Sequence, residues 1–140
     1  MASTIHVDIV SAEREIFSGE ADMVFAPAAM GELGIAPRHA PLLTRMKPGT
    51  VRVQHAGEEQ VFYVSGGILE IQPHGVTVLS DTAQRATDID EAAAEAAKRR
   101  AEEALANQSE DLDVARAQSE LLEAVARLKA LEQIRKKAGR

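Results

Sequence analysis

The side chains that could do chemistry are few and scattered along the chain. There is no cysteine, which excludes a thiolate nucleophile, a disulfide and a cysteine-based zinc site. Glu32 and His39 could form an acid–base pair, but both lie in segments that predict turns, and no shared pocket is implied. The four histidines follow no metal-binding spacing: His6, His39, His55 and His74. The residues therefore predict neither catalysis nor a metal site.

Glycine spacing predicts no phosphate site either. Gly31 and Gly34 form neither a dinucleotide fingerprint nor a Walker loop, because no helix follows them to present its N-terminal N–H groups. Ser65-Gly66-Gly67 is not a nucleophile elbow and is more typical of a bulge or a close backbone approach within a strand.

Composition argues against two classes of partner. The 140 residues carry a net charge of −6 and only 3 % of them are aromatic, which disfavours nucleic acid. No run of about eighteen apolar residues occurs, so direct membrane insertion is not expected. The segment 1–13 has neither the basic nor the apolar region of a secretory signal. We expect a cytoplasmic protein, or one held at a membrane through its partners.

The chain divides into two parts with different periodicities. Apolar and polar residues alternate from Ile5 to about Thr82, with turn residues roughly every 8–12 positions, which predicts an all-β sandwich or barrel over 1–86. Residues 87–140 begin with an alanine-rich stretch and predict two helices in a hairpin. We expect Asp88 to cap the first helix, and Ser109 or Asp111 to cap the second.

The predicted hairpin has a weak apolar seam. Alanine buries little area, so a seam built on it holds a single docked arrangement only loosely. The second helix is expected to add an apolar stripe that includes Leu122 and Val125, and then Leu131 and Ile134 at spacings that turn away from it. The inner face expected for the first helix is Ile89, Ala92, Ala93, Ala96, Ala97, Ala101 and Ala104. We infer a hairpin that can change its docking position.

Charge along the hairpin is segregated. Residues 87–123 hold eleven acidic and four basic side chains, whereas 124–140 hold six basic side chains and one acidic one. Basic residues in the last turns favour the helix dipole, which explains part of this pattern. The remainder indicates an acidic protein surface as partner.

The segment "GELGIAPRHAPLL", 31–43, combines glycines and prolines with apolar residues. Proline fixes φ and removes a backbone donor, so a regular strand is not expected here. We expect a rigid, irregular loop with Leu33 and Ile35 tucked in and Leu42-Leu43 entering the core. Rigid loops on a β scaffold are preferred recognition sites, so the loop is interpreted as a surface that fits a partner.

Two stretches carry a family resemblance that covers essentially the whole chain. "GELGIAPRHAPLLTRMKPGTVRV" and "FYVSGGILEIQPHGVTVLSDTAQRATDIDEAAAEAAKRRAEEAL" closely resemble the epsilon subunits of bacterial F-type ATP synthases. The resemblance implies a ten-stranded antiparallel β-sandwich followed by a two-helix antiparallel hairpin. It also implies a non-catalytic central-stalk subunit at the cytoplasmic face of the inner membrane, which couples proton flow to ATP synthesis and restrains ATP hydrolysis.

The same resemblance implies partners and contact residues. The sandwich would bind the gamma subunit, and the c-subunit ring would face the residues Gly31, Glu32, Leu33, Gly34 and His39. The second helix would extend toward acidic segments of the catalytic head, formed by the alpha and beta subunits. The matching charges there are Arg127, Lys129, Arg135, Lys136 and Lys137.

Two other functions remain as alternatives. The hairpin could fold over a nucleotide in a free-standing small-molecule sensor, which would not co-purify with a gamma subunit. A β-sandwich enzyme could use Glu32 and His39, and replacing both with alanine would then abolish its turnover.

One departure from the family predicts weak ATP binding or none. Some members bind ATP on the folded hairpin through an Ile/Leu-Asp-x-x-Arg-Ala motif, whose matching residues here are Ile89, Asp90, Ala93 and Ala94. Ala93 stands where the arginine would supply a phosphate-binding guanidinium, for which Arg99 and Arg100 could compensate only in part. Isothermal titration calorimetry with ATP should show little or no heat of binding, and a micromolar affinity would contradict this prediction.

Overall fold

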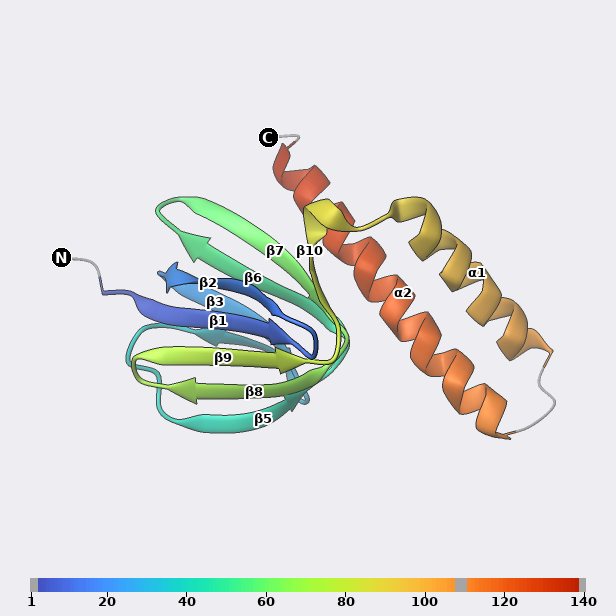
Figure 1. Cartoon of the computed structure of the whole chain (residues 1–140), viewed down its shortest axis with the longest axis horizontal. Helices are drawn as coiled ribbons and strands as arrows, with labels where there is room; N and C mark the ends of the chain where they lie inside the picture. The colour runs from blue at the N-terminus through green and yellow to red at the C-terminus, as the bar shows by residue number, and fades with distance from the viewer. Residues whose placement is uncertain (1–2, 108–110, 139–140) are drawn as a thin grey trace.

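The chain forms ten strands and then two long helices (Figure 1). The structure is a computed structural model that describes residues 3–107 and 111–138, with side chains described for 3–107 and 113–136. The strands are β1 (Ile5–Ser11), β2 (Glu15–Ala21), β3 (Met23–Ala28), β4 (Gly31–Ile35), β5 (Leu42–Met46), β6 (Gly49–His55), β7 (Glu58–Val64), β8 (Gly67–Gln72), β9 (Gly75–Ser80) and β10 (Ala83–Arg85). A 3₁₀ turn (Ala86–Asp88) leads to the helices α1 (Glu91–Ala106) and α2 (Asp111–Ala138).

The strands form one sheet that folds into a nearly closed sandwich. Their order is β10-β7-β6-β3-β5-β8-β9-β1-β2, with β4 paired to β3. Most neighbours are antiparallel, as expected, but β1 and β9 pair in parallel, with Val7 opposite Val76. Both strands run toward the helical end of the sandwich (Figure 1). Strand β1 lies between β9 and β2, parallel to β9 and antiparallel to β2. The predicted antiparallel sandwich is therefore confirmed except at this one parallel pair.

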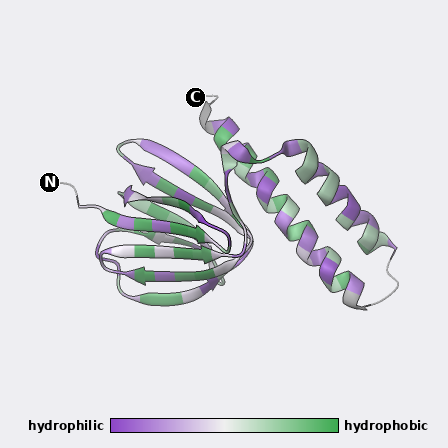
Figure 2. Cartoon of the chain, in the orientation of Figure 1, coloured by the Kyte–Doolittle hydropathy of each residue, from purple (hydrophilic) through white to green (hydrophobic). Residues whose placement is uncertain are grey.

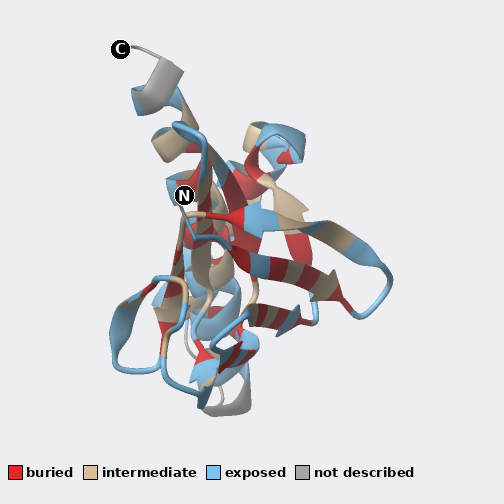
Figure 3. Ribbon diagram, turned by 90° about the vertical axis from the view of Figure 1, so that its left-hand side faces the viewer, coloured by how far each residue is buried: buried red, intermediate tan, exposed pale blue. Residues whose placement is uncertain are grey.

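The core lies between the inward faces of the strands. In β1, Ile5, Val7 and Ile9 are fully buried, while the alternate side chains face outward. Figure 3 shows this alternation of buried and more exposed residues along the strands. The predicted two-residue period is therefore the feature that sets the core.

Strand β7 is buried on both of its faces. Phe62 and Val64 belong to the sandwich core, whereas Val61 and Tyr63 belong to a second apolar cluster that α2 covers. A short continuous apolar run is typical of a strand covered on both sides. The outer face of β7 is thus the place where the hairpin meets the sandwich.

The first helix begins later than expected. Its N-cap is Asp90, whose side chain accepts a hydrogen bond from the Ala93 backbone N–H at 3.1 Å. Asp88 lies in the 3₁₀ turn instead, because Ile89 is extended and largely buried in the cluster under α2. The expected cap at Asp88 is therefore wrong, and the cap proposed at Ser109 lies outside the described residues.

The helices pack through alanine, and the faces we predicted are confirmed only in part, since Ala101 is buried as expected. In α1 the buried residues are Ala94 and Ala101, whereas Ala92, Ala93 and Ala104 are exposed. In α2, Leu122 and Val125 of the predicted apolar stripe are exposed and line a groove between α2 and the sandwich, whereas Leu121 and Leu128 are partly buried. The buried residues of α2 are Ala117, Ala124, Ala126, Ala130 and Leu131. The mixed hydropathy of both helices is visible in Figure 2, which agrees with a thin seam.

Gly67 is a position where the fold requires glycine. Its φ is +113°, and an added Cβ would lie 2.1 Å from the Leu79 carbonyl oxygen and 2.9 Å from the Ser80 Cα. Strands β8 and β9 therefore approach each other more closely at this point than any side chain permits.

Replacing Gly67 with alanine should lower the free energy of unfolding by more than about 3 kcal/mol, because a backbone clash adds to the cost of positive φ. Gly57→Ala is the matched control: its φ is +81° and nothing lies within 4 Å of the added Cβ. That variant should lose only about 1–2 kcal/mol. Urea unfolding of both variants measures the difference, and equal losses would contradict the close approach.

Candidate functional site

Three exposed apolar side chains share the outer face of neighbouring strands. Leu43 of β5 is 68 % exposed, Ile68 of β8 is 39 % exposed and Leu79 of β9 is 50 % exposed. The register places Ile68 opposite Leu79, and Leu43 opposite Glu70, which shares a face with Ile68. We call these three residues the outer-face patch. Exposed apolar patches of this kind are typical of protein-binding surfaces.

Sequence reasoning missed this patch. It placed Leu42-Leu43 in the core, but Leu42 is 39 % exposed and Leu43 more so. The sequence does contain a sign of outward-facing apolar residues. Ile68-Leu69 and Val78-Leu79 are each two consecutive apolar residues within one strand. Because neighbours in a strand point to opposite faces, one residue of each pair must face outward.

The segment 31–35 is a strand rather than an irregular loop. It is β4, paired with β3 from Gly31 opposite Ala28 to Ile35 opposite Val24. Its residues come before the two prolines of the segment, Pro37 and Pro41, so its backbone N–H donors remain available for pairing. As expected, Ile35 is buried and Leu33 packs against the core.

The candidate pair of Glu32 and His39 is not brought together. Glu32 accepts a hydrogen bond from Arg52 at 3.2 Å and lines a groove beside α2. His39 instead contacts its neighbour's carbonyl, with Nδ1 2.7 Å from the Ala40 oxygen. The preceding residue bonds to the Pro73 carbonyl in the β8–β9 turn, at the end of the sandwich away from the helices (Figure 1). The geometry therefore gives no support to an acid–base pair.

Two of the predicted basic contact residues are engaged by other parts of the chain. The Arg127 guanidinium lies over the Tyr63 ring, 4.4 Å from its centroid, and its Nε is 3.4 Å from the Gln84 Oε1. Arg135 forms a two-armed ion pair with Glu91 at the start of α1. The Arg135 hydrogen bonds hold the pKa of Glu91 below its usual value. These two arginines therefore tie α2 to the sandwich and to α1.

The other predicted basic residues of α2 make no such ties. Lys136 pairs with Glu132 of the same helix at 3.5 Å, and Lys129 is exposed. Lys137 lies in the last turns of α2, and its side chain is outside the described residues. The described basic side chains thus fall into two pairs, one that holds the hairpin in place and one that faces solvent.

The residues of the degenerate nucleotide motif do come together. Ile89, Asp90, Ala93 and Ala94 line a cavity of about 210 Å³ that Arg127 also borders. The cavity is smaller than the roughly 300–1,000 Å³ of ordinary ligand pockets. The Asp90 carboxylate is engaged as the helix cap, and neither Arg99 nor Arg100 lines the cavity.

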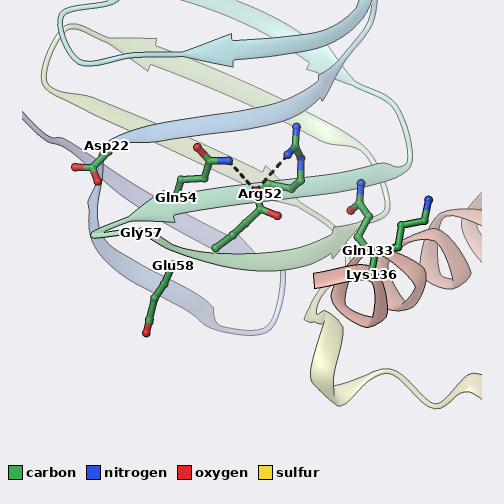
Figure 4. A pocket seen from close by; sticks show the side chains of 8 residues that line it. Asp22, Arg52, Gln54, Gly57, Glu58, Gln133 and Lys136 are labelled. Atoms are coloured by element: carbon green, nitrogen blue, oxygen red, sulfur yellow. Dashed lines mark hydrogen bonds and ion pairs between the residues drawn. The ribbon is translucent and has the colours of Figure 1, made fainter. Parts of the chain in front are cut away.

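A larger hollow of about 610 Å³ lies between the β6–β7 hairpin and the C-terminal part of α2 (Figure 4). Three of its polar side chains bond to one another, since Glu59 accepts from Arg52 at 3.2 Å and from Gln54 at 2.8 Å. The remaining lining residues are Asp22, Gly57, Glu58, Gln133 and Lys136. The mixture of acidic and basic groups selects no particular ligand.

One histidine has a distinct electrostatic setting. His6 Nδ1 lies 2.8 Å from the Glu20 carboxylate, and its Nε2 lies 3.1 Å from that of Asp8. The hydrogen bond to Glu20, followed by that to Asp8, raises the pKa of His6 above its usual value. Because the two carboxylates occupy opposite ring nitrogens, the arrangement links β1 and β2 and does not resemble a metal site. Across the described ranges, no group of three metal-ligating side chains is found.

Among the described helices, none is long and apolar enough to span a membrane.

Comparison with known proteins assigns both parts of the chain to one family. Residues 4–86 match the model for the β-sandwich domain of the ATP synthase delta/epsilon chain, and residues 87–132 match the model for its long α-helix domain. The ATP synthase epsilon chain of Nitrosococcus oceani is 70 % identical over 99 % of this chain and all of its own length. Those of Alkalilimnicola ehrlichii and Halorhodospira halophila are 64 % and 60 % identical, each over 99 % of both chains.

Solved structures with the same fold come from mitochondrial ATP synthases. A chain in the Euglena gracilis OSCP/F1/c-ring structure aligns with a TM-score of 0.82 at 17 % identity, covering 91 % of this chain and 81 % of that one. A chain of the Tetrahymena thermophila central stalk/c-ring structure aligns with a TM-score of 0.60 at 13 % identity, covering 92 % and 97 %. These two structures show the shared fold, and the family models and curated relatives show the family. The chain belongs to the ATP synthase delta/epsilon family, among the epsilon chains of bacterial F-type ATP synthases, which are structural rather than catalytic subunits.

Proposed function

We propose that this epsilon chain is a rotor subunit of the central stalk, in which the sandwich binds the rotor and the hairpin moves to restrain ATP hydrolysis. In this role it couples proton flow to ATP synthesis without a catalytic site or cofactor of its own. It would lie at the cytoplasmic face of the inner membrane and be held there by its partners. The observation that carries the proposal is that Arg127 and Arg135, which would meet the catalytic head, are occupied in the docked hairpin.

The gamma subunit is the proposed partner of the outer-face patch. Leu43, Ile68 and Leu79 offer apolar area on a rigid sheet, with the charged residues Arg45 and Glu70 on the same face. Protein interfaces commonly combine an apolar centre with a polar rim. A rigid sheet also suits a permanent attachment, because little conformational entropy is lost when it binds.

The c ring is the proposed partner of the surface along β4. Gly31, Glu32 and Gly34 are exposed on this strand, and Leu33 is partly exposed. The chain then continues toward His39 at the far end of the sandwich. If the c ring contacts both the Gly31 end of β4 and His39, it must lie along the whole length of β4. The Met30 side chain, 99 % exposed at the β3–β4 turn, extends this surface.

The acidic segments of the alpha and beta subunits are the proposed partners of the basic end of α2. In the docked hairpin, Lys129 and Lys136 face solvent while Arg127 and Arg135 are engaged. The full set of charges becomes available only when α2 leaves the sandwich. A nucleotide-sensing function is less well supported, because the cavity at Ile89 and Asp90 is small.

Replacing Leu79 with lysine should weaken association with the gamma subunit by about 10- to 100-fold, since a buried leucine contributes about 1.5–3 kcal/mol. Leu122→Lys is the matched control, because Leu122 is 59 % exposed but lies on α2. Titration of each variant with gamma measures the affinities, and circular dichroism checks that both fold. Equal affinities of the two variants would move the gamma site away from the outer-face patch.

Replacing Lys129 and Lys136 together with glutamine should raise ATP hydrolysis by the reconstituted complex by roughly twofold or more. Each interfacial ion pair contributes about 0.2–1 kcal/mol, and neither lysine ties the hairpin to the rest of the chain. The control is Arg100→Gln with Arg116→Gln, which removes the same charge from exposed helical sites outside the basic end. If both double variants hydrolyse ATP equally fast, net charge alone explains the effect.

A further inference from the structure

Polar atoms that are buried without a partner gather at one seam. In the part of the chain whose side chains are described, three such atoms occur: Arg52 Nε on β6, Tyr63 Oη on β7 and Gln133 Oε1 on α2. The two strands are the ones that α2 packs against. The sandwich core and the α1–α2 contact contribute none of them. Among the described side chains, the buried polar atoms without a hydrogen-bond partner therefore lie at the surface between the hairpin and the sandwich.

Tyr63 is the clearest of the three. Its side chain is fully buried, and the face of its ring holds the Arg127 guanidinium. Burial raises the pKa of the phenol to about 12, so the hydroxyl keeps its proton and requires an acceptor. Gln84, its neighbour in register on β10, directs its Oε1 to Arg127 instead. The ring of Tyr63 thus favours docking of α2, while its hydroxyl opposes it.

Undocking would reverse this penalty. When α2 leaves β7, water can reach the hydroxyl and supply the missing hydrogen bond. The usual cost of a buried, unpartnered polar group corresponds to roughly a 5- to 140-fold change in an equilibrium constant. On the α2 side, this seam consists of alanines, one leucine and the partly buried Ile134, which offer limited apolar area to offset such a cost.

We propose that the Tyr63 hydroxyl sets the docking equilibrium of the hairpin, keeping α2 poised for release while the Tyr63 ring and Arg127 hold it in place. This inference rests on the hairpin movement proposed above. It assigns the equilibrium between docked and undocked α2 to the Tyr63 hydroxyl. Tyr63 acts here as a positioning residue that meets no partner of the complex itself.

The test measures how often the seam opens in the full chain. The sequence has no cysteine, so Ala130→Cys, at a fully buried position of the seam, introduces a single thiol whose labelling by a thiol reagent reports undocking. Adding Tyr63→Phe keeps the ring and removes the hydroxyl, and should slow labelling by roughly 5- to 140-fold. Adding Tyr63→Leu instead removes the ring beneath Arg127 together with the hydroxyl, and should give faster labelling than Tyr63→Phe, because only the ring distinguishes these two variants.

The outcomes separate this inference from the proposed function. Ala26→Cys places a thiol in the sandwich core, where labelling requires the sandwich itself to open. If the thiols at positions 130 and 26 label at the same rate, the hairpin does not undock separately, and the proposed movement fails. If position 130 labels faster but Tyr63→Phe leaves its rate unchanged or raises it, the hairpin moves and only the role of the hydroxyl is overturned.

Discussion

The contact between α2 and the outer face of β7 is the constraint on which the rest of the molecule depends. Val61 and Tyr63 share one apolar cluster with Ala126, Ala130 and Leu131 of α2. Small side chains bury little area, so the contact is weak for a helix of this length. The sandwich has its own core on the other side of β7 and does not need the hairpin to complete it. One part of the chain is therefore firmly built and the other is loosely attached.

Electrostatic contacts also hold the hairpin in its docked position. Arg127 and Arg135 hold α2 in its docked position through Tyr63, Gln84 and Glu91. Exposed ion pairs such as the one between Arg135 and Glu91 are individually weak and are screened by salt. In the function proposed above, an acidic surface of the catalytic head would compete for these two arginines. The internal contacts of α2 and its proposed partner contacts would then exclude each other.

The sandwich, in contrast to the hairpin, is rigid. Paired strands fix the outer-face patch, and the close approach at Gly67 locks β8 against β9. Strand β4 extends the paired surface toward the end that carries His39. In the proposed rotor role, a surface that keeps its shape would suit an attachment that transmits torque, because deformation would dissipate the torque.

The sequence by itself determined the change from strands to helices after residue 86, the two-residue alternation that forms the core, and the scarcity of apolar area in the hairpin. These are local patterns, since periodicity states which side of an element is apolar. Only the tertiary structure decided that β1 joins β9 in parallel, that Leu43 faces outward and that Asp90 caps α1. Each of these depends on which distant element lies alongside, and that choice follows from the packing of the whole chain rather than from any short stretch of it.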